Sequence, residues 1–302
     1  MIPENEVIPL KKWFAAVLLA ALVLTGCGPK QPEAHEAQLF AMDTLMSLRI
    51  WGDEALVTQT EDTLRSLETL LSATAEDSDI ARLNRDGTAE LQPQTADLLQ
   101  QALDCAARTG GAFDPTVYPL VCLWGFPSGE YHIPTEAELT GALAHTGPQH
   151  LQLDGAAAAL DAGCSVDLGG IAKGYAAGRV RAILQEAGVT SAIVSLGGNV
   201  AAVGKKPDGS AWTVGLQDPD RPESYFGTVS IEAACVVTSG AYQRYFEENG
   251  VRYHHILDPY TGCPAESGVK SVSVIAQDDT LADALSTALF VMGLDAGAEF
   301  QK

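Results

Sequence analysis

Two adjacent glycines lie between a short apolar run and a helical pattern in the segment DLGGIAKGY, residues 167–175. Residues 164–166 before them are expected to form a strand, and residues 175–184 after them a helix. Because glycine has no Cβ, the backbone can bend there and approach a ligand closely. Any fold of this chain must therefore accommodate a sharp strand-to-helix turn, here called the glycine bend (residues 167–174), where free helix N–H groups offer a seat for an anion.

Charged side chains flank the glycine bend. Asp167 provides a carboxylate, and Lys173 provides an ammonium group. Together with free amides they suit a ligand that carries hydroxyl or imide donors as well as phosphates, as a nucleotide does. The segment has neither the spacing of a Walker loop nor that of the dinucleotide-binding fingerprint. A plain helix start with solvated charges explains the segment equally well, so the segment alone leaves the choice open.

A second candidate site lies in a helix expected over residues 280–292. Asp283 and Thr287 are four residues apart there, so both side chains emerge on the same face. Carboxylate and hydroxyl oxygens are hard ligands of the kind that Mg²⁺ prefers. Taken alone, such a pair is more often an ordinary exposed face, or a favourable charge near a helix N-terminus.

His255 is the candidate base. It is expected at the end of a strand over residues 253–257, with its neighbour His254 on the opposite face. A histidine with a pKa near neutrality can remove a proton from a hydroxyl nucleophile. A single strand histidine is more often structural, and no Gly-x-Ser-x-Gly elbow points to a serine hydrolase instead.

The N-terminus has the pattern of a targeting segment. Two lysines precede an apolar run over residues 13–24, which is short for a membrane span but typical of a signal peptide. Residues 24–27, LTGC, resemble the lipobox of bacterial lipoproteins, and a plain signal peptide or an uncleaved anchor is the alternative. We expect a signal peptide over residues 1–26, lipidation at Cys27, a flexible tether over residues 27–38, and one functional unit over residues 39–302. The protein is then expected on the extracytoplasmic face of the bacterial cell membrane, held by lipid.

The charge of the chain restricts its partners. A formal net charge of −21 argues against nucleic acid as a ligand, and against docking on anionic lipid through charge alone. An acidic protein that handles an anionic ligand needs local positive charge, from a lysine, a helix N-terminus or a divalent cation.

The remaining patterns mix helices with runs of consecutive strands. This mixture favours an α+β fold with mostly antiparallel or mixed sheets and packed helices. Strands are expected over residues 39–51, 191–195, 200–203, 212–216, 228–237 and 269–276, a hairpin over residues 151–160, and helices over residues 55–71, about 95–108, and from Thr135.

Five motifs in order resemble the ApbE family, the FAD:protein FMN transferases or flavin transferases. They are the segment DLGGIAKGY, SLGGN at residues 195–199, TSG at 238–240, HHILDPYTG at 254–262 and ADALSTA at 282–288. The resemblance runs from about Phe40 to the C-terminus, and it implies a single ApbE-like domain. This sequence has Asp43 where many members have glycine, and Thr74 where the family often has an aromatic residue.

The resemblance implies a reaction and its participants. FAD is bound with Mg²⁺, a threonine hydroxyl of a partner protein attacks the FMN phosphorus, AMP leaves, and FMN stays attached as a phosphoester. The implied acceptors are exported or membrane redox subunits with a Ser/Thr-Gly-Ala-Thr-like segment. By motif, Asp283, Thr287 and the carbonyl of Gly170 would bind the metal, and His255 would be the base. FAD contacts are implied for Met42, Ala112, Phe113, Asp114, Asp167, Lys173 and Ile256.

Two other functions stay open on the sequence. An FAD pyrophosphatase would use water in place of threonine at the same site and release FMN and AMP. A flavin-binding lipoprotein without chemistry would bind FAD and release no AMP. The preference between Mg²⁺ and Mn²⁺ is open as well.

Overall fold

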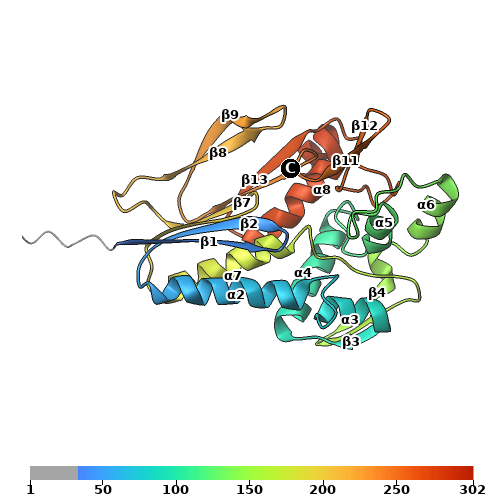
Figure 1. The fold of residues 1–302 in the computed structure, drawn as a ribbon, viewed down its shortest axis with the longest axis horizontal. Coiled ribbons are helices and arrows are strands. Elements are labelled where there is room, and N and C mark those ends of the chain that lie inside the picture. Colours follow the sequence, from blue (N-terminus) through green and yellow to red (C-terminus); the bar gives the residue numbers. More distant parts are fainter. Residues whose placement is uncertain (1–32, 302) are drawn as a thin grey trace, which may run out of the picture. The chain divides into compact units, whose positions relative to one another are not determined.

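The computed structural model describes residues 33–301 (Figure 1). The predicted signal peptide, Cys27 and the first part of the predicted tether lie outside the described residues. The first strand, β1 (Ala34–Ala41), already includes residues 34–38, which we expected in the tether. The boundary of the folded unit therefore lies before residue 39, at Ala34.

A six-stranded sheet forms the centre of the described chain. Its strand order is β1-β2-β6-β7-β10-β13, and every neighbouring pair is antiparallel, which confirms the α+β prediction. Antiparallel neighbours can be joined by tight turns, and β1–β2 and β6–β7 are joined in this way. The bounds are β1 (Ala34–Ala41), β2 (Thr44–Trp51), β6 (Ser191–Leu196), β7 (Asn199–Gly204), β10 (Cys235–Gly240) and β13 (Ser271–Ala276).

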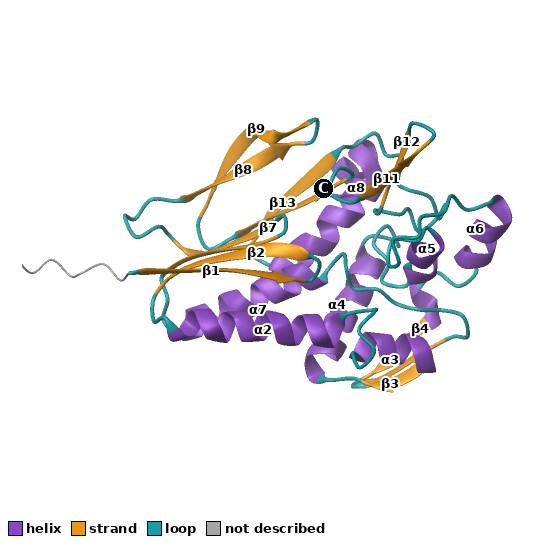
Figure 2. Ribbon diagram, in the orientation of Figure 1, coloured by secondary structure: helices purple, strands orange, loops and turns teal. Residues whose placement is uncertain are grey.

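Helices cover one face of this sheet, and the hairpin β8–β9 lies over the other (Figure 2). Helix α7 packs against both α2 and α8, and α8 packs against β10 and β13. The helices are α2 (Ala55–Leu71), α4 (Pro93–Arg108), α7 (Ala172–Glu186) and α8 (Asp279–Phe300), and the hairpin strands are β8 (Trp212–Asp218) and β9 (Arg221–Ile231). Among the described helices, α8 is long and apolar enough to cross a membrane, but half of its apolar stretch is buried in the core.

Smaller elements complete the fold. A three-stranded sheet lies beside α3, and two short helices pack beside the β11–β12 hairpin. These elements are α3 (Asp79–Asp86), β3 (Thr88–Glu90), α5 (Tyr118–Leu123), α6 (Glu136–Leu143), η1 (Pro148–His150), β4 (Leu151–Asp154), β5 (Ala157–Leu160), β11 (Tyr245–Glu248) and β12 (Val251–His254). The predicted hairpin around residue 155 and the capping box at Thr135 are both confirmed.

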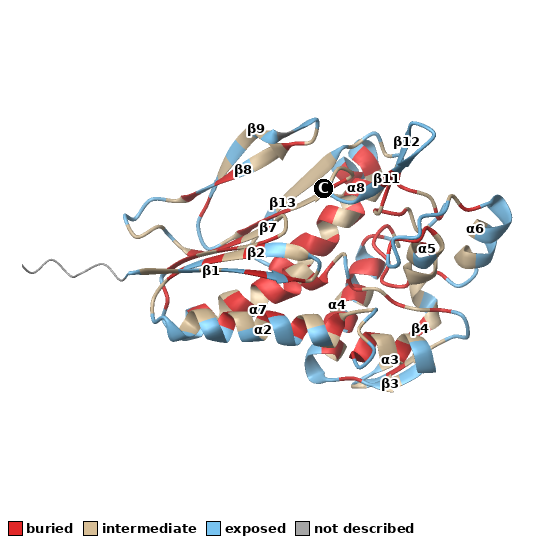
Figure 3. Ribbon diagram, in the orientation of Figure 1, coloured by how far each residue is buried: buried red, intermediate tan, exposed pale blue. Residues whose placement is uncertain are grey.

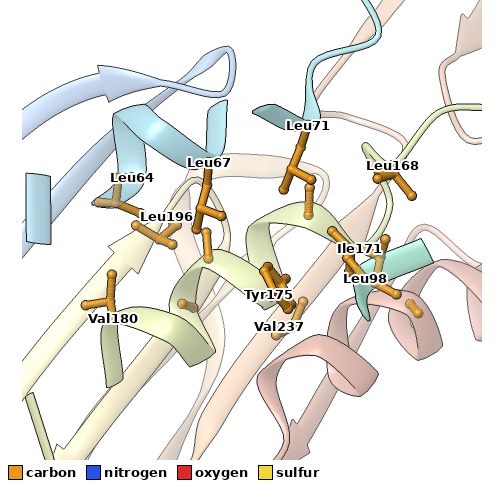
Figure 4. Packing of buried hydrophobic residues seen from close by; sticks show 14 of the residues in the cluster. Leu64, Leu67, Leu71, Leu98, Leu168, Ile171, Tyr175, Val180, Leu196 and Val237 are labelled. Atoms are coloured by element: carbon orange, nitrogen blue, oxygen red, sulfur yellow. The ribbon is translucent and has the colours of Figure 1, made fainter. Parts of the chain in front are cut away.

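The main core lies between the sheet and its helices, where Figure 3 shows the most continuous burial. Leu64 and Leu67 of α2 are buried at helical spacing, and they face Val180 of α7 and Leu196 of β6 (Figure 4). Burying each such leucine stabilises the fold by about 1.5–3 kcal/mol. This packing makes α7 the central helix of the layer and fixes where the glycine bend can lie.

The predicted strand over residues 39–51 is wrong, because the chain reverses in its middle. Met42 and Asp43 form a two-residue turn with φ angles of 49° and 58° between β1 and β2. Both angles lie in the left-handed region, as the tight turns of hairpins require, although neither residue is a glycine. The Met42 N–H donates to Glu68 Oε1 at 2.7 Å, which helps to hold the turn.

Three further strand predictions are corrected by the structure. The strand expected over residues 253–257 ends at His254, the last residue of β12, so His255 lies just after the strand. Residues 164–166 are not in a sheet, because the side chain of Asn84 bonds Val166 in place of a neighbouring strand. Asn84 Oδ1 accepts the Val166 N–H at 2.7 Å, and Asn84 Nδ2 donates to the Val166 carbonyl at 2.8 Å. The strand expected over residues 228–237 is divided between β9 and β10, with Ala233 between them at a φ of 47°.

Candidate functional site

One end of the central sheet gathers the turns that flank the site. Met46, Leu196, Asn199 and Val237 lie opposite one another on β2, β6, β7 and β10. The β1–β2 turn and the β6–β7 turn therefore lie at the same end of the strands, here called the turn end of the sheet. The two turns touch, since a Cβ on Gly197 would come within 2.2 Å of Thr44 Oγ1. The structure thus brings Met42 to the turn end, in a turn and not in the strand where we expected it.

Helices α7 and α8 run in opposite directions and approach each other closely. A Cβ on Gly174 would lie 2.3 Å from the Asp279 carbonyl oxygen and 2.6 Å from the Asp283 Cβ. Real Cβ atoms do not tolerate such distances, so this close approach requires glycine. Four residues earlier in the bend, a Cβ on Gly170 would lie 3.4 Å from Thr287 Oγ1 and 3.2 Å from the Phe113 ring. The fold therefore places the glycine bend against the part of α8 that carries both predicted metal ligands.

Asp283 is held by the first turn of α7. Its side chain is buried, with the residue 3% exposed, and Oδ2 accepts the Gly174 N–H at 2.7 Å. The positive end of the α7 dipole stabilises this carboxylate. We expected the N–H groups at this helix start to bind an anionic ligand. At Gly174 the N–H instead binds the carboxylate of Asp283. The alternative of an ordinary exposed face for Asp283 is wrong.

The side-chain oxygen atoms near the bend could act as ligands of a hard cation. Among residues 33–301 no donor is bonded to the other carboxylate oxygen, Asp283 Oδ1, and Thr287 Oγ1 lies on the same side of α8. In the described chain no group of three or more His, Cys, Asp or Glu side chains could hold a metal ion. One carboxylate and one hydroxyl are a sparse set, which suits Mg²⁺ because this ion keeps several waters and accepts phosphate oxygens.

The start of α8 is also fixed from α7. Arg181 of α7 places its guanidinium 2.8 Å from Asp279 Oδ2 and donates to the Gln277 carbonyl. Burial raises the pKa of Asp279 to about 6, and the charge of Arg181 opposes this rise. Asp278 caps the helix by accepting the Leu281 N–H at 3.0 Å. These contacts anchor α8 one turn before Asp283.

His255 has the tautomer that a base needs. Its Nδ1 lies 3.0 Å from the carbonyl oxygen of Arg244. A carbonyl only accepts, so Nδ1 carries the proton and Nε2 keeps a free lone pair. Burial lowers the pKa of His255 to about 4, and the positive charges of Lys173 and Arg244 lower it further against the bond to the Arg244 carbonyl. His254 points the other way, with its ring 5.5 Å from that of Phe290, as we predicted.

The charges of Lys173 and Arg244 act on Asp167 as well as on His255. The Asp167 backbone N–H donates to the Pro115 carbonyl at 2.8 Å, so the bend is joined to the loop that follows residues 112–114. Burial raises the pKa of the Asp167 carboxyl, while the Gly169 N–H and the charges of Lys173 and Arg244 oppose the rise. Lys173 Nζ also donates to the Gly169 carbonyl at 3.3 Å. The fold thus brings His255 close to Asp167 and Lys173 of the bend, from which it is distant in sequence.

Arg244 lies beside His255 and acts on Asp167, although no motif in the sequence pointed to it. Its carbonyl orients His255, and its charge acts on both His255 and Asp167. The guanidinium donates to the Phe126 carbonyl and lies 5.9 Å from the centre of the Phe126 ring. The available signal was a lone cation within an aromatic segment, in a chain with 18 Lys and Arg against 39 Asp and Glu.

Four predicted FAD contacts lie mostly inside the protein. Ala112, Phe113, Asp114 and Ile256 are all buried. Asp114 Oδ1 accepts the Thr116 N–H at 2.8 Å and the Thr116 hydroxyl at 2.6 Å, so its carboxylate organises its own loop. Burial raises the pKa of Asp114, and these bonds oppose that rise. Ile256 packs in a small cluster with Phe290. A role of these four residues in FAD binding stays a prediction.

Comparison with known proteins gives consistent matches. The family model described as the ApbE family matches residues 42–302. The FAD:protein FMN transferase of Treponema pallidum is 35% identical over 317 residues, which cover 94% of this chain and 86% of that protein. The crystal structure of the ApbE protein from Thermotoga maritima is 36% identical, with a TM-score of 0.83 and 89% of each chain covered. The apo flavinyl transferase ApbE from Pseudomonas stutzeri is 33% identical, with a TM-score of 0.81, and covers 91% of this chain and 89% of that one.

Proposed function

The chain belongs to the ApbE family, and from that premise we propose that it transfers FMN from FAD to a threonine hydroxyl of a partner protein in a Mg²⁺-dependent reaction. FMN transfer from FAD to protein is the activity of this enzyme, as its relatives carry it. The proposal adds the metal, the kind of acceptor side chain, and the residues that act. One observation supports it above the others: α8 brings Asp283 and Thr287 against the glycine bend.

Asp283, Thr287 and the Gly170 carbonyl are proposed to hold the cation. The carboxylate is already oriented by the Gly174 N–H, so binding a cation through the remaining lone pairs needs little rearrangement. When bound, Mg²⁺ would offset the charge of the pyrophosphate. FAD is proposed to contact Met42, the loop over residues 112–114, Asp167, Lys173 and Ile256.

The transfer is proposed as an in-line displacement at the FMN phosphorus. The threonine oxygen of the acceptor forms a new bond to that phosphorus, and the bond from the phosphorus to the AMP phosphate breaks. The threonine proton passes to Nε2 of His255, whose Nδ1 proton is held by the Arg244 carbonyl. AMP leaves with the bonding electron pair, and the ammonium of Lys173 offsets negative charge as it develops.

The low pKa of His255 is compatible with this role. The imidazole is neutral near pH 7, so it can accept a proton without first losing one. Lys173 and Arg244 both keep the ring neutral through their charges. Both charges also lie where an anionic substrate would be attracted in a chain with a net charge of −21.

A reconstituted reaction tests the proposal. Purified protein is mixed with FAD, MgCl₂ and a redox domain that contains a Ser/Thr-Gly-Ala-Thr-like segment, and the acceptor is weighed by intact-protein mass spectrometry. We expect one added FMN and one AMP per acceptor, none with EDTA, and none with an acceptor whose threonine is replaced by valine. Release of free FMN and AMP without any labelled acceptor would show a pyrophosphatase and overturn the proposal.

The cellular place of the enzyme is proposed from the N-terminal sequence. Residues 24–27 support lipidation at Cys27 after removal of residues 1–26, which would hold the enzyme on the extracytoplasmic face of the bacterial cell membrane. Its acceptors are then exported or membrane redox subunits. Labelling with a fatty acid and fractionation test this: a Cys27→Ser variant should lose both the label and the membrane association. A label that persists in this variant would contradict lipidation at Cys27.

A further inference from the structure

Ser239 joins the central sheet to the metal helix. It belongs to the TSG motif at the turn end of β10, a motif whose role the sequence alone does not indicate. Its neighbour two residues earlier, Val237, points into the core on the helix-covered face, and Ser239 shares that face. Ser239 Oγ lies 2.7 Å from Ser286 Oγ and 3.4 Å from Thr287 Oγ1, both on α8.

The protons of these three hydroxyls have only one consistent arrangement. Ser286 Oγ donates to the Asp283 carbonyl at 2.8 Å, and a carbonyl has no proton to give, so the one Ser286 proton is used there. In the short contact between Ser239 and Ser286, the Ser239 hydroxyl must therefore be the donor and Ser286 Oγ the acceptor. Because the Ser239 proton is used in that bond, the Thr287 hydroxyl donates in the contact between Thr287 and Ser239.

We propose that Ser239 and Ser286 are positioning residues that hold the Thr287 hydroxyl proton away from the metal site, so that its lone pairs face the glycine bend. The hydroxyls form a one-way chain from Thr287 through Ser239 and Ser286 to the carbonyl of Asp283. This inference rests on the proposed function, because it assumes that Asp283 and Thr287 hold a cation.

The chemistry of a hydroxyl ligand explains why such a chain matters. A threonine binds a cation through an oxygen lone pair, and a proton that points at the cation opposes binding. A hydroxyl on an open surface rotates freely, whereas Ser286 is fully buried, so water does not compete for its bonds. The chain begins at one proposed side-chain ligand and ends on the backbone of the other. Partners that orient metal ligands in this way typically contribute about 10–100-fold in metal affinity or activity.

Ser273 provides a matched control. Ser273 lies on β13, opposite Thr238 of β10, and its hydroxyl is 2.8 Å from Thr238 Oγ1. Thr238 is the residue before Ser239. Because neighbouring residues of a strand point to opposite faces, this hydroxyl pair lies on the face away from α8. Replacing Ser273 by alanine removes one hydroxyl from the same region of the sheet without touching the chain to Thr287.

Binding of Mn²⁺, measured directly, tests the inference without any transfer reaction. Each full-length protein is titrated with MnCl₂ in the presence of FAD but without acceptor, and free Mn²⁺ is followed by electron paramagnetic resonance. We expect Ser239→Ala and Ser286→Ala to bind Mn²⁺ about ten-fold more weakly than the wild type. Ser239→Thr, which keeps the hydroxyl, and Ser273→Ala should both bind like the wild type.

The outcomes separate this inference from the proposed function. If the wild type binds no divalent cation, the proposed metal site itself fails. If the wild type binds Mn²⁺ and Ser239→Ala binds it equally well, the metal site stands and the positioning role is wrong. Equal weakening in Ser239→Ala and Ser273→Ala would also overturn the role, because it would reflect a general loosening of the sheet. FAD binding in EDTA should be the same in all these proteins.

Discussion

The two halves of the site are built in different ways. The proposed metal half, which contains Asp283 and Thr287, lies where α7 crosses α8, and the distance between the helices is set by the absence of a side chain at Gly174. The proposed base half lies after β12, where His255 is oriented by a backbone carbonyl and its pKa is set by burial and by the charges of Lys173 and Arg244. One half depends on how closely two backbones approach, and the other on an electrostatic environment.

This difference predicts different responses to substitution. In a close-packed crossing a single methyl group must displace a helix, so small changes in volume have large effects. In the base half each charge adds to a dominant effect of burial, so the loss of one charge has a graded effect. A lost ligand of the proposed cation should affect the reaction most, because the cation would act directly on the pyrophosphate. A lost charge near His255 should affect it least.

The largest effect is expected from Asp283→Asn. The Gly174 N–H would draw the amide oxygen to the position of Oδ2, and the NH₂ group would then take the place of Oδ1, where it cannot bind a cation. We expect the rate of FMN transfer to fall at least about 1,000-fold, because a bound metal contributes several kcal/mol to the transition state. Initial rates at several MgCl₂ concentrations measure this loss.

Asp295→Asn is the matched control for Asp283. Asp295 is exposed on the same helix, beyond the kink at Gly293, and the same loss of one charge there should leave the rate unchanged. Full activity of Asp283→Asn would contradict the assignment of this carboxylate to the metal half.

The next largest effect is expected from His255→Gln. Glutamine cannot accept the threonine proton as imidazole does, and we expect transfer to slow about 100-fold, while FAD binding, followed by flavin fluorescence, is retained. His132→Gln, which changes an exposed histidine paired with Glu138, should leave both quantities unchanged. Equal losses of FAD binding and transfer in His255→Gln would contradict its role as the base.

The sequence predicts elements well where the signal is local. Helix α2 could be predicted from end to end because Leu64, Leu67 and Leu71 repeat at helical spacing. The turn at Met42 and Asp43 could not, because neither residue is the glycine that such turns favour. The strand predicted over residues 164–166 failed because Asn84, 82 residues away, satisfies the backbone there.

The site shows the same division. The residue types and their motifs pointed to Asp283, Thr287 and His255, whereas the contacts that position them come only from the fold. The Gly174 N–H and Asp283 are 109 residues apart, and Ser239 and Thr287 are 48 apart. No local pattern encodes such distances. The sequence therefore predicted which residues form the proposed metal half, and the structure shows which contacts position them.

A third, smaller effect is expected from Gly174→Ala, which tests the close crossing. The new Cβ would lie 2.3 Å from the Asp279 carbonyl oxygen, so α7 and α8 must separate. We expect the free energy of unfolding to fall by about 2 kcal/mol, as overpacked cores do. Gly178→Ala is the control one turn on: its Cβ would lie 3.6 Å from the nearest Asp279 atom, an ordinary contact.

Gly178→Ala should be neutral or stabilising by up to about 1 kcal/mol, because alanine favours a helix more than glycine does. Urea denaturation of both variants measures the difference. A Gly174→Ala protein as stable as Gly178→Ala, with unchanged Mn²⁺ binding, would show that the crossing tolerates a side chain, and the contrast between the two halves would be lost.

The smallest effect is expected from Arg244→Met, which leaves the backbone carbonyl and therefore the tautomer of His255 unchanged. In the wild type the pKa of His255 is lowered to about 4, so the plot of kcat/KM against pH should lose activity only as pH falls through about 4, where His255 takes up a proton. Because burial is the largest cause, removing the Arg244 charge should raise this pKa by less than about one unit.

Arg252→Met is the control on the same hairpin, since Arg252 stacks 3.9 Å from the Tyr245 ring centre and pairs with Glu247 at 3.1 Å. Equal shifts in both variants would mean that His255 senses the charge of the whole hairpin, and a wild-type limb near pH 6.5 would mean that burial does not set this pKa.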